Sequence, residues 1–438
     1  MRGAVGRALD AVRTYPAMVG SVSIILILIG ITIYAVISIP LSEAIALWDA
    51  THEAWIDAPR SAAPAWTNLF RSEKLPETQI LRLADGEKSE GKASESVRYD
   101  ETVLRFDYRF TSFPDEARIF LDVAYGQQAP IVAVTWIKPD GTEIRLFRGN
   151  PDRSHRIRIS RRAEVLAAFG IPDQAGPSAN PAVMQGEYKL RIESQSFEEA
   201  FSIDGRLVVA GKVYGLAGTD NEGRDLMIGL LWGTPIALAF GLLATIGTTI
   251  FGFILAAIGT WFGGWADASV QRLTEVGMML PMLPILIMVG KFFSSSIWVL
   301  LGFIVGLGIF TGAVKSYRAM FLQVKDSLYI EAARAYGASD MRIIFRYMIP
   351  KIIPALVPSF VMGIPRFVFL EASFAVLGIA DPRLPTWGKV LSDGRAGLYL
   401  GHYHGVLEPA FLLILTGLSF TMLGYVLDRT FNTGLRSV

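Results

Sequence analysis

The sequence predicts an α-helical polytopic membrane protein with six transmembrane helices and one inserted, mainly β, sandwich-like domain. Two observations support this fold class. The 438-residue chain is 52% hydrophobic and 18% charged, whereas a soluble domain carries about 25% charged residues. Its long uncharged stretches lie on either side of residues 43–225, and that middle stretch has the composition of a soluble domain. We therefore expect a membrane body with one aqueous insertion.

Composition also excludes several classes of function. The net charge is +1, with 41 Lys and Arg against 40 Asp and Glu, so nothing suggests a nucleic-acid surface. The chain has no cysteine, which excludes disulfides, thiolate chemistry and cysteine metal sites. His402 and His404 alternate near the C-terminus, but a structural metal site needs more ligands, so we favour a surface or interface role. We see no catalytic constellation, and we expect no catalytic residue, cofactor or metal in this chain.

The N-terminal apolar run predicts a retained membrane helix. No charged residue occurs between Thr14 and Ser42, which is long enough to cross a bilayer. Three arginines among the first 13 residues place the N-terminus in the cytoplasm. The rival interpretation is a signal peptide cleaved after Ala44-Ile45-Ala46. We disfavour it because the run is about twice the usual length and Glu43 lies beside the cleavage site.

Five further apolar runs complete the predicted membrane body. They extend over Leu226–Ala266, Val276–Gly290, Phe292–Val314, Ile352–Ala380 and Pro409–Leu427. The first is long enough for a short surface helix and one span. Six spans put both chain ends on one side, and the seven basic residues of 315–351 make that side cytoplasmic. We expect residues 1–42 to form the N-terminus and first helix, 43–215 an extracytoplasmic β-rich domain, and 216–438 a core with five helices.

A short cytoplasmic helix followed by a tight turn is predicted over about 326–340. Asp326 or Ser327 is expected to cap its start, and Gly337 to supply the left-handed residue at its end. Glu331 and Arg334 are spaced to pair at i, i+3. One apolar face follows from the i, i+3, i+4, i+7 spacing of Tyr329, Ala332, Ala333 and Tyr336. Its small residues suit docking into a groove on a partner, while an ordinary re-entry loop fits the pattern equally well.

The same segment resembles the E-A-A-x3-G-x9-I-x-L-P signature of ABC-importer permeases. The matching residues are Glu331-Ala332-Ala333, Gly337 and Ile349-Pro350; Tyr347 and Ile349 depart from the family preference. The resemblance implies a coupling helix that docks on the ATP-binding-cassette subunit and passes its closure to the membrane helices. The coupling residues so implied are Tyr329, Glu331, Ala332, Ala333, Arg334, Tyr336 and Gly337.

Three more elements are similar to the dipeptide/oligopeptide branch of that family and imply the ABC type I importer permease fold. They are Gly218-Thr219-Asp220 with Gly223-Arg224-Asp225 (G-T-D-x-x-G-R-D), Glu371-Ala372-Ser373-Phe374 with Leu377-Gly378 (E-A-S-L-S-F-L-G-L-G), and Pro385-Thr386-Trp387-Gly388 (P-x-W-G). The resemblance covers the first span and residues 215–438. The departures are Arg366 within the fifth span, Gly424-Tyr425 in place of glycine-aspartate, and the long external segment.

The resemblance also implies the partners and the location of the chain. It implies a second permease subunit, two ATPase subunits that use ATP and Mg, an extracytoplasmic substrate-binding protein, membrane lipid, and a prokaryotic cell membrane with both termini cytoplasmic. The chain itself is expected to bind no nucleotide, because the phosphate-loop-like Gly86–Ala93 ends in alanine where Ser or Thr is required. Peptides are the expected substrate, with oligosaccharides and nickel as alternatives.

Two charged residues within the fifth span bear on competing function classes. Arg366 and Glu371 are costly in lipid, so we expect them to face protein, water or each other, with a possible role in gating or substrate contact. They are also the only candidates for the relay that an ion-driven secondary transporter would need. The other competitor, a membrane-anchored sensor, does not need six spans. Both rank behind the permease.

The middle stretch predicts an antiparallel β-sandwich with one helix. Leu104, Phe106, Tyr108 and Phe110 alternate with charged residues, as in a half-buried strand. Further strands are expected over Ala117–Tyr125, Ile131–Ile137, Thr142–Phe147, Glu187–Ile192 and Arg206–Val209, a hairpin at Pro139-Asp140-Gly141, a helix over Arg161–Phe169 and a polar linker over Glu77–Asp100. The domain is interpreted either as a docking surface for the binding protein or as a stabilising insert that packs on the partner permease.

Overall fold

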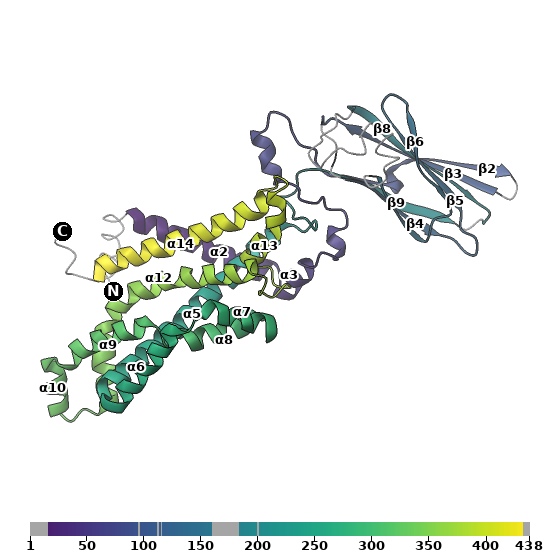
Figure 1. The fold of residues 1–438 in the computed structure, drawn as a ribbon. Helices are drawn as coiled ribbons and strands as arrows, with labels where there is room; N and C mark the ends of the chain where they lie inside the picture. The colour runs from purple at the N-terminus through teal and green to yellow at the C-terminus, as the bar shows by residue number, and fades with distance from the viewer. Residues whose placement is uncertain are drawn as a thin grey trace. The chain divides into compact units, whose positions relative to one another are not determined.

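The computed structural model describes residues 16–94, 97–111, 114, 116–159, 184–198 and 201–431 (Figure 1). The chain forms two compact units. The helical unit takes the chain up to Trp48, Ile228–Ser392 and the chain from Val406 on, and the β unit takes Asp49–Met227 and Asp393–Gly405. The borders of the β unit therefore differ from those of the expected extracytoplasmic domain, residues 43–215. Residues 211–220 stay with the β unit because their backbone bonds to residues 61–63, for example Ala63 N–H to Lys212 O at 2.9 Å.

The helical unit contains most of the helices. Their bounds are α2 Pro16–Ser38, α3 Leu41–Leu47, α5 Leu226–Phe262, α6 Gly264–Met279, α7 Met282–Phe292, α8 Ile297–Gly308, α9 Gly312–Lys325, α10 Leu328–Ala335, α11 Asp340–Ile343, α12 Ile349–Val376, α13 Trp387–Leu398 and α14 His404–Phe431. A π-helical segment, Ile344–Met348, joins α11 to α12.

Four helical stretches of the described chain are long and apolar enough to cross a membrane, and two bent pairs raise the number to six. The four are α2, α5, residues 340–376 and α14. The bent pairs are α6 with α7, at 74°, and α8 with α9, at 46°.

Three of the predicted spans have wrong borders. Leu226–Ala266 does not divide into a surface helix and a span, because α5 is one helix of 37 residues. Val276–Gly290 crosses the break between α6 and α7. Pro281 causes that break, since proline has no N–H and drives Leu280 before it to an extended ψ of 125°. Phe292–Val314 likewise includes the irregular residues on both sides of α8.

Close approaches between helices hold the helical unit together. Trp387 at the start of α13 is fully buried, and its indole N–H donates to the Leu230 carbonyl at 2.9 Å. A side chain at Gly233 would put its Cβ 2.3 Å from the Trp387 ring. Gly388 has the same constraint, since its Cβ would lie 2.6 Å from Ala372 Cα on α12. Small residues thus allow α5, α12 and α13 to approach one another closely.

The β unit is a sandwich of two antiparallel sheets (Figure 1). Its strands are β1 Gln79–Arg82, β2 Glu87–Ser94, β3 Val97–Tyr108, β4 Glu116–Ala124, β5 Ile131–Ile137, β6 Glu143–Gly149, β7 Ser154–Arg158, β8 Gly186–Ser196 and β9 Ser202–Ala210. The sheet orders are β1-β9-β4-β7 and β2-β3-β8-β5-β6. One buried core takes Leu104 and Leu190 from one sheet and Ile119 and Leu207 from the other, so the sheets pack face to face.

Most strand predictions are confirmed, but the predicted polar linker is wrong. Leu104, Phe106 and Tyr108 are buried on one face of β3, and Gly141, at φ +82°, turns β5 into β6. The polar linker over 77–100 does not exist, because that stretch holds β1, β2 and the start of β3. The sequence of β2 is polar, and this edge strand is held by its backbone ladder with β3 instead of an apolar face. The helix predicted over 161–169 lies outside the described residues.

Candidate functional site

The short helix α10 ends in a hydrogen-bonded glycine turn. Gly337 has φ +79°, the left-handed conformation that the sequence predicts. Its N–H donates to Arg334 O at 2.9 Å, and Ala338 N–H donates to Ala333 O at 3.0 Å. These two bonds form a Schellman motif, which fixes the end of the helix. At the other end Ser327 occupies the capping position, but its hydroxyl donates back to Val324 O and caps nothing.

The apolar face predicted for α10 is split between two sides of the helix. Ala333 is buried together with Ile330, which the prediction omitted. These two residues, at i and i+3, pack into a core with Phe253 and Ala257 of α5. The opposite side of the helix stays exposed, with Leu328 at 82% and Tyr336 at 92%. We call this side the α10 strip; it consists of Leu328, Tyr329, Ala332 and Tyr336.

The expected Glu331–Arg334 ion pair is absent from the described residues. The Arg334 guanidinium instead lies over the ring of Trp261, 4.3 Å from its centroid, in a cation–π contact. The Trp261 indole N–H donates to Asp340 Oδ1 at 3.0 Å. Sequence reasoning missed Trp261. The only signal for it in the sequence is an aromatic residue near the end of a long apolar run, two residues before Gly263-Gly264.

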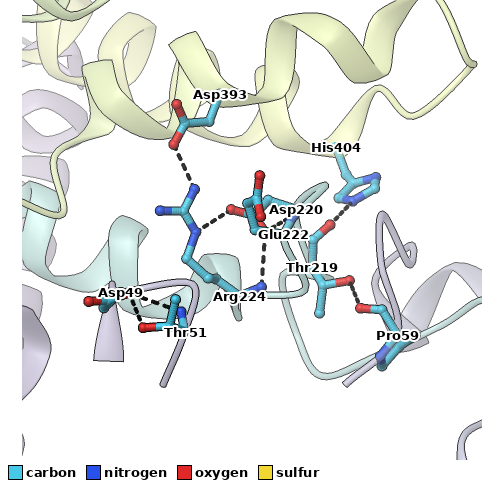
Figure 2. A network of polar contacts seen from close by, with 9 residues as sticks. All are labelled: Asp49, Thr51, Pro59, Thr219, Asp220, Glu222, Arg224, Asp393 and His404. Carbon is cyan, nitrogen blue, oxygen red and sulfur yellow. Dashed lines mark hydrogen bonds and ion pairs between the residues drawn. The ribbon is translucent and has the colours of Figure 1, made fainter. Parts of the chain in front are cut away.

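A polar network in the β unit gathers the Gly218–Asp225 motif (Figure 2). The Thr219 hydroxyl donates to Pro59 O at 2.8 Å and accepts from Ala62 N–H at 2.9 Å. Gly218 has φ +76°, and a Cβ there would lie 2.4 Å from Ala62 O. The glycine thus lets the motif approach residues 59–62 closely.

Arg224 and the Thr219 carbonyl connect the motif to two later segments (Figure 2). Arg224 Nε bonds Asp220 Oδ2 at 2.6 Å, and Arg224 Nη2 bonds Asp393 Oδ2 at 2.7 Å. His404 Nε2 lies 2.9 Å from Thr219 O. Asp225 caps the start of α5 by accepting from Met227 N–H at 2.8 Å, while burial raises the pKa of its carboxyl. The motif was predicted, but its contacts with Asp393 and His404 were not.

Arg366 and Glu371 are on α12 in different surroundings. Glu371 is 1% exposed and lies beside Thr386 at a small cavity that Phe374 and Asp381 also line. Arg366 is exposed, with its guanidinium 5.8 Å from the Phe367 ring centroid. The two charges therefore do not form a pair. Within the described residues, no group of three or more His, Cys, Asp or Glu is arranged to hold a metal.

A β-unit cavity of about 420 Å³ lies between residues 50–60 and strands β4 and β7. Arg118, on β4, lines this cavity and donates to the carbonyls of Ile56 and Ala58. On β9, the Nε–H of Arg206 is shared between the two carboxylate oxygens of Asp57, at 2.9 and 3.1 Å. These two arginines bind residues 50–60 to the outer face of the four-stranded sheet.

Comparison with known proteins identifies the family. The model of the binding-protein-dependent transport system inner membrane component matches residues 248–437. A glutathione transport system permease protein of Pectobacterium atrosepticum is 30% identical over 223 residues, covering 50% of this chain and 73% of the relative. Its Escherichia coli counterpart is 33% identical over 217 residues, covering 47% and 68%. A dipeptide transport system permease protein of Bacillus subtilis is 29% identical over 221 residues, covering 50% and 68%.

A solved carbohydrate-binding module in complex with β-1,4-galactotriose aligns with 35% of this chain and 94% of its own at 9% identity, with a TM-score of 0.15. That likeness is too weak to support any statement about the chain. The sequence relatives do support one, because their match covers more than two thirds of their length. The family consists of multi-pass inner membrane permeases that work with ATPase and substrate-binding partners and are not themselves catalytic. The chain therefore belongs to the binding-protein-dependent transport system inner membrane components, as the permease subunit of an ABC importer.

Proposed function

We propose that the chain forms one half of the translocation path of a peptide importer. In this proposal it pairs with a second permease, two ATPase subunits bind ATP and Mg, and a separate binding protein delivers the solute. The names of the relatives, which are glutathione and dipeptide permeases, support a peptide substrate.

The α10 strip is proposed to dock on the ATPase subunit. The observation that carries this proposal is a rigid helix whose exposed side presents large apolar residues, Leu328 and Tyr336, at 82% and 92%. Exposed apolar groups clustered on one short element are typical of a binding surface. The buried side of α10 packs into the core of its own unit. A displacement of the strip by the ATPase would therefore also move the membrane helices that form this core.

The proposed topology has six spans, with α10 in the cytoplasm and the β unit outside. Counting each bent helix pair as one span gives six, and an even number returns the chain to its starting side. Basic residues on both sides of α10, such as Lys325 and Arg342, support a cytoplasmic location. The β unit follows the first span and is then extracytoplasmic, on the side where the binding protein delivers the solute.

Photo-crosslinking tests the docking of the α10 strip. Tyr336 is replaced by p-benzoylphenylalanine in the assembled complex and irradiated. We expect an adduct with the ATPase subunit, because a side chain that is 92% exposed on this chain becomes an interface residue. The matched control is Tyr399, which is 93% exposed and lies between α13 and α14, on the proposed outer side. Docking is excluded if Tyr336 gives no ATPase adduct, or if Tyr399 gives as much.

A further inference from the structure

Trp261, in the last turn of α5, contacts the chain on both sides of the glycine turn that ends α10. Trp261 is 5% exposed and precedes the final residue of α5. Its indole N–H bonds Asp340 at the start of α11, and its ring carries the guanidinium of Arg334 in the last turn of α10. Arg334 and Asp340 lie on opposite sides of the Gly337 turn. One side chain of α5 therefore contacts the chain before and after that turn.

A second attachment joins α5 to the residue that closes α9. Lys325 Nζ donates to the carbonyls of Thr260 and Trp261 at 2.7 and 3.0 Å. Carbonyls in the last turn of a helix have no partner within the helix, and a cation there is favourable. Lys325 lies three residues before α10. Two consecutive residues of α5 thus bind the chain on both sides of α10.

The covalent connection from α10 to the membrane helix α12 is less regular than the contact with α5. From α10 the chain continues through α11 into the π-helical segment Ile344–Met348 and then into α12, and α12 contains Pro354, Pro358 and Pro365. A π-helical insertion and internal prolines interrupt the regular hydrogen-bond ladder and make a helix easier to bend. The end of α5 packs into the same core as Ile330 and Ala333, as do Ile344 and Met348 of the π-helical segment. The end of α5 is the stiffer connection because its last turns are regular α-helix without a proline.

We propose that Trp261 is a positioning residue that transmits the displacement of α10 to α5. The inference rests on the proposed docking of α10, and it adds that α5 is driven directly although it lies more than 60 residues earlier in the chain. The Asp340 bond supplies the directional part of the contact, and the Arg334 contact supplies packing. Transmission then depends on the indole N–H and not only on a large ring.

The variant that isolates this bond is Trp261→Phe, which keeps an aromatic ring for Arg334 and removes the N–H. We expect the complex to assemble and hydrolyse ATP, while solute transported per ATP falls by about tenfold, the factor that one hydrogen bond to a charged group carries. Asp340→Ala removes the acceptor and is expected to lower the ratio equally. Asp340→Asn keeps an oxygen acceptor and is expected to retain most of it. The double variant Trp261→Phe/Asp340→Ala is expected to be no worse than either single one.

Trp265→Phe is the matched control, since Trp265 lies four residues later and is 85% exposed; its ratio should equal that of the unaltered protein. A normal ratio in Trp261→Phe overturns the inference. So does a parallel loss of assembly, ATPase and transport in both Trp261→Phe and Asp340→Ala, which would assign these residues to folding alone. The Tyr336 crosslink separates the two proposals. With the crosslink present and a normal Trp261→Phe ratio, only this inference fails, whereas without the crosslink the docking itself fails.

Discussion

Glu198 of the β unit shows how one side chain can fix a loop from far along the chain. Its carboxylate accepts the backbone N–H groups of Gly126, Gln127 and Gln128 at 2.7 to 2.8 Å. The bond from Gln128, followed by those from Gly126 and Gln127, lowers the pKa of Glu198 below its ordinary value of 4.5, because N–H donors favour the charged form. A carboxyl whose pKa is lower in the folded than in the unfolded state stabilises the fold above its unfolded pKa. That contribution disappears as the pH falls through the folded value.

Hydrogen exchange measures this pH dependence. At neutral pH we expect Glu198→Gln to exchange the amides of residues 126–128 several-fold faster than the unaltered chain at the same pH. The difference is expected to shrink as the pH falls below 4.5, because the unaltered carboxylate then also takes up a proton. Amides of the β3–β8 ladder serve as the internal reference. A difference that stays constant down to acid pH would contradict the role given to the charge.

Arg224 illustrates what could and could not be predicted for a single residue. The G-R-D spacing in the sequence assigned Arg224, together with Asp220, to a family motif. What the arginine does depends on Asp393, which lies 169 residues away, and no local pattern encodes that distance. Both motif residues are almost fully buried, and such a pair is stable only when its remaining hydrogen-bonding groups are satisfied. Asp220 meets this need by also accepting the N–H groups of Glu222 and Arg224.

At the scale of one element, the turn after α10 separates a tolerated change from a damaging one. A Cβ at Gly337 would meet no atom within 4 Å, so Gly337→Ala adds only backbone strain, about 1–2 kcal/mol for a left-handed residue. Gly337→Pro forces φ to about −65° and removes the N–H that bonds Arg334, at a cost of about 3 kcal/mol or more. We expect Gly337→Pro to abolish transport and ATPase coupling with the subunit still in the membrane, and Gly337→Ala to keep most of both. Reconstituted vesicles measure both activities, and normal uptake by the proline variant would refute the docking role of α10.

Helix borders were harder to predict than helix existence. The absence of charge located every apolar stretch, but charge does not determine where a helix ends. Pro281 ends α6 and Gly263 ends α5, by backbone geometry that hydropathy does not contain. For α10 the sequence predicted a short helix and the glycine turn that ends it. It failed to separate the exposed from the buried side, because Ile330 and Ala333 turn inward toward residues of α5 that come some 75 residues earlier.

For the molecule as a whole, the absence of cysteine makes the proposed topology directly testable. Single cysteines are introduced at Ile80 on β1, which is 51% exposed, and at Tyr336 on α10, which is 92% exposed. In right-side-out membrane vesicles a membrane-impermeant maleimide is expected to label position 80 at once. Position 336 is expected to react only after permeabilisation. Labelling of position 336 in sealed vesicles would reverse the orientation, and with it the docking of the ATPase on α10.

The two-part organisation was visible in the composition, since apolar flanks enclosed a soluble-type stretch. The alternation of apolar residues located β3, β4 and β5, but β1 and β2 were missed because their sequences are short or polar. The inclusion of residues 393–405 in the β unit could not be predicted. It arises from contacts such as Arg224–Asp393 and His404–Thr219, which join segments that the sequence separates by most of the membrane body.

These contacts mean that the β unit cannot be excised as a simple loop. The chain passes between the two units after Trp48, Met227, Ser392 and Gly405, whereas an ordinary loop insertion is joined at only two points. A deletion of residues 49–227 would take away the guanidinium that binds Asp393 and the carbonyl that binds His404. A minimal transporter would therefore need a redesigned turn between α13 and α14 as well as the deletion.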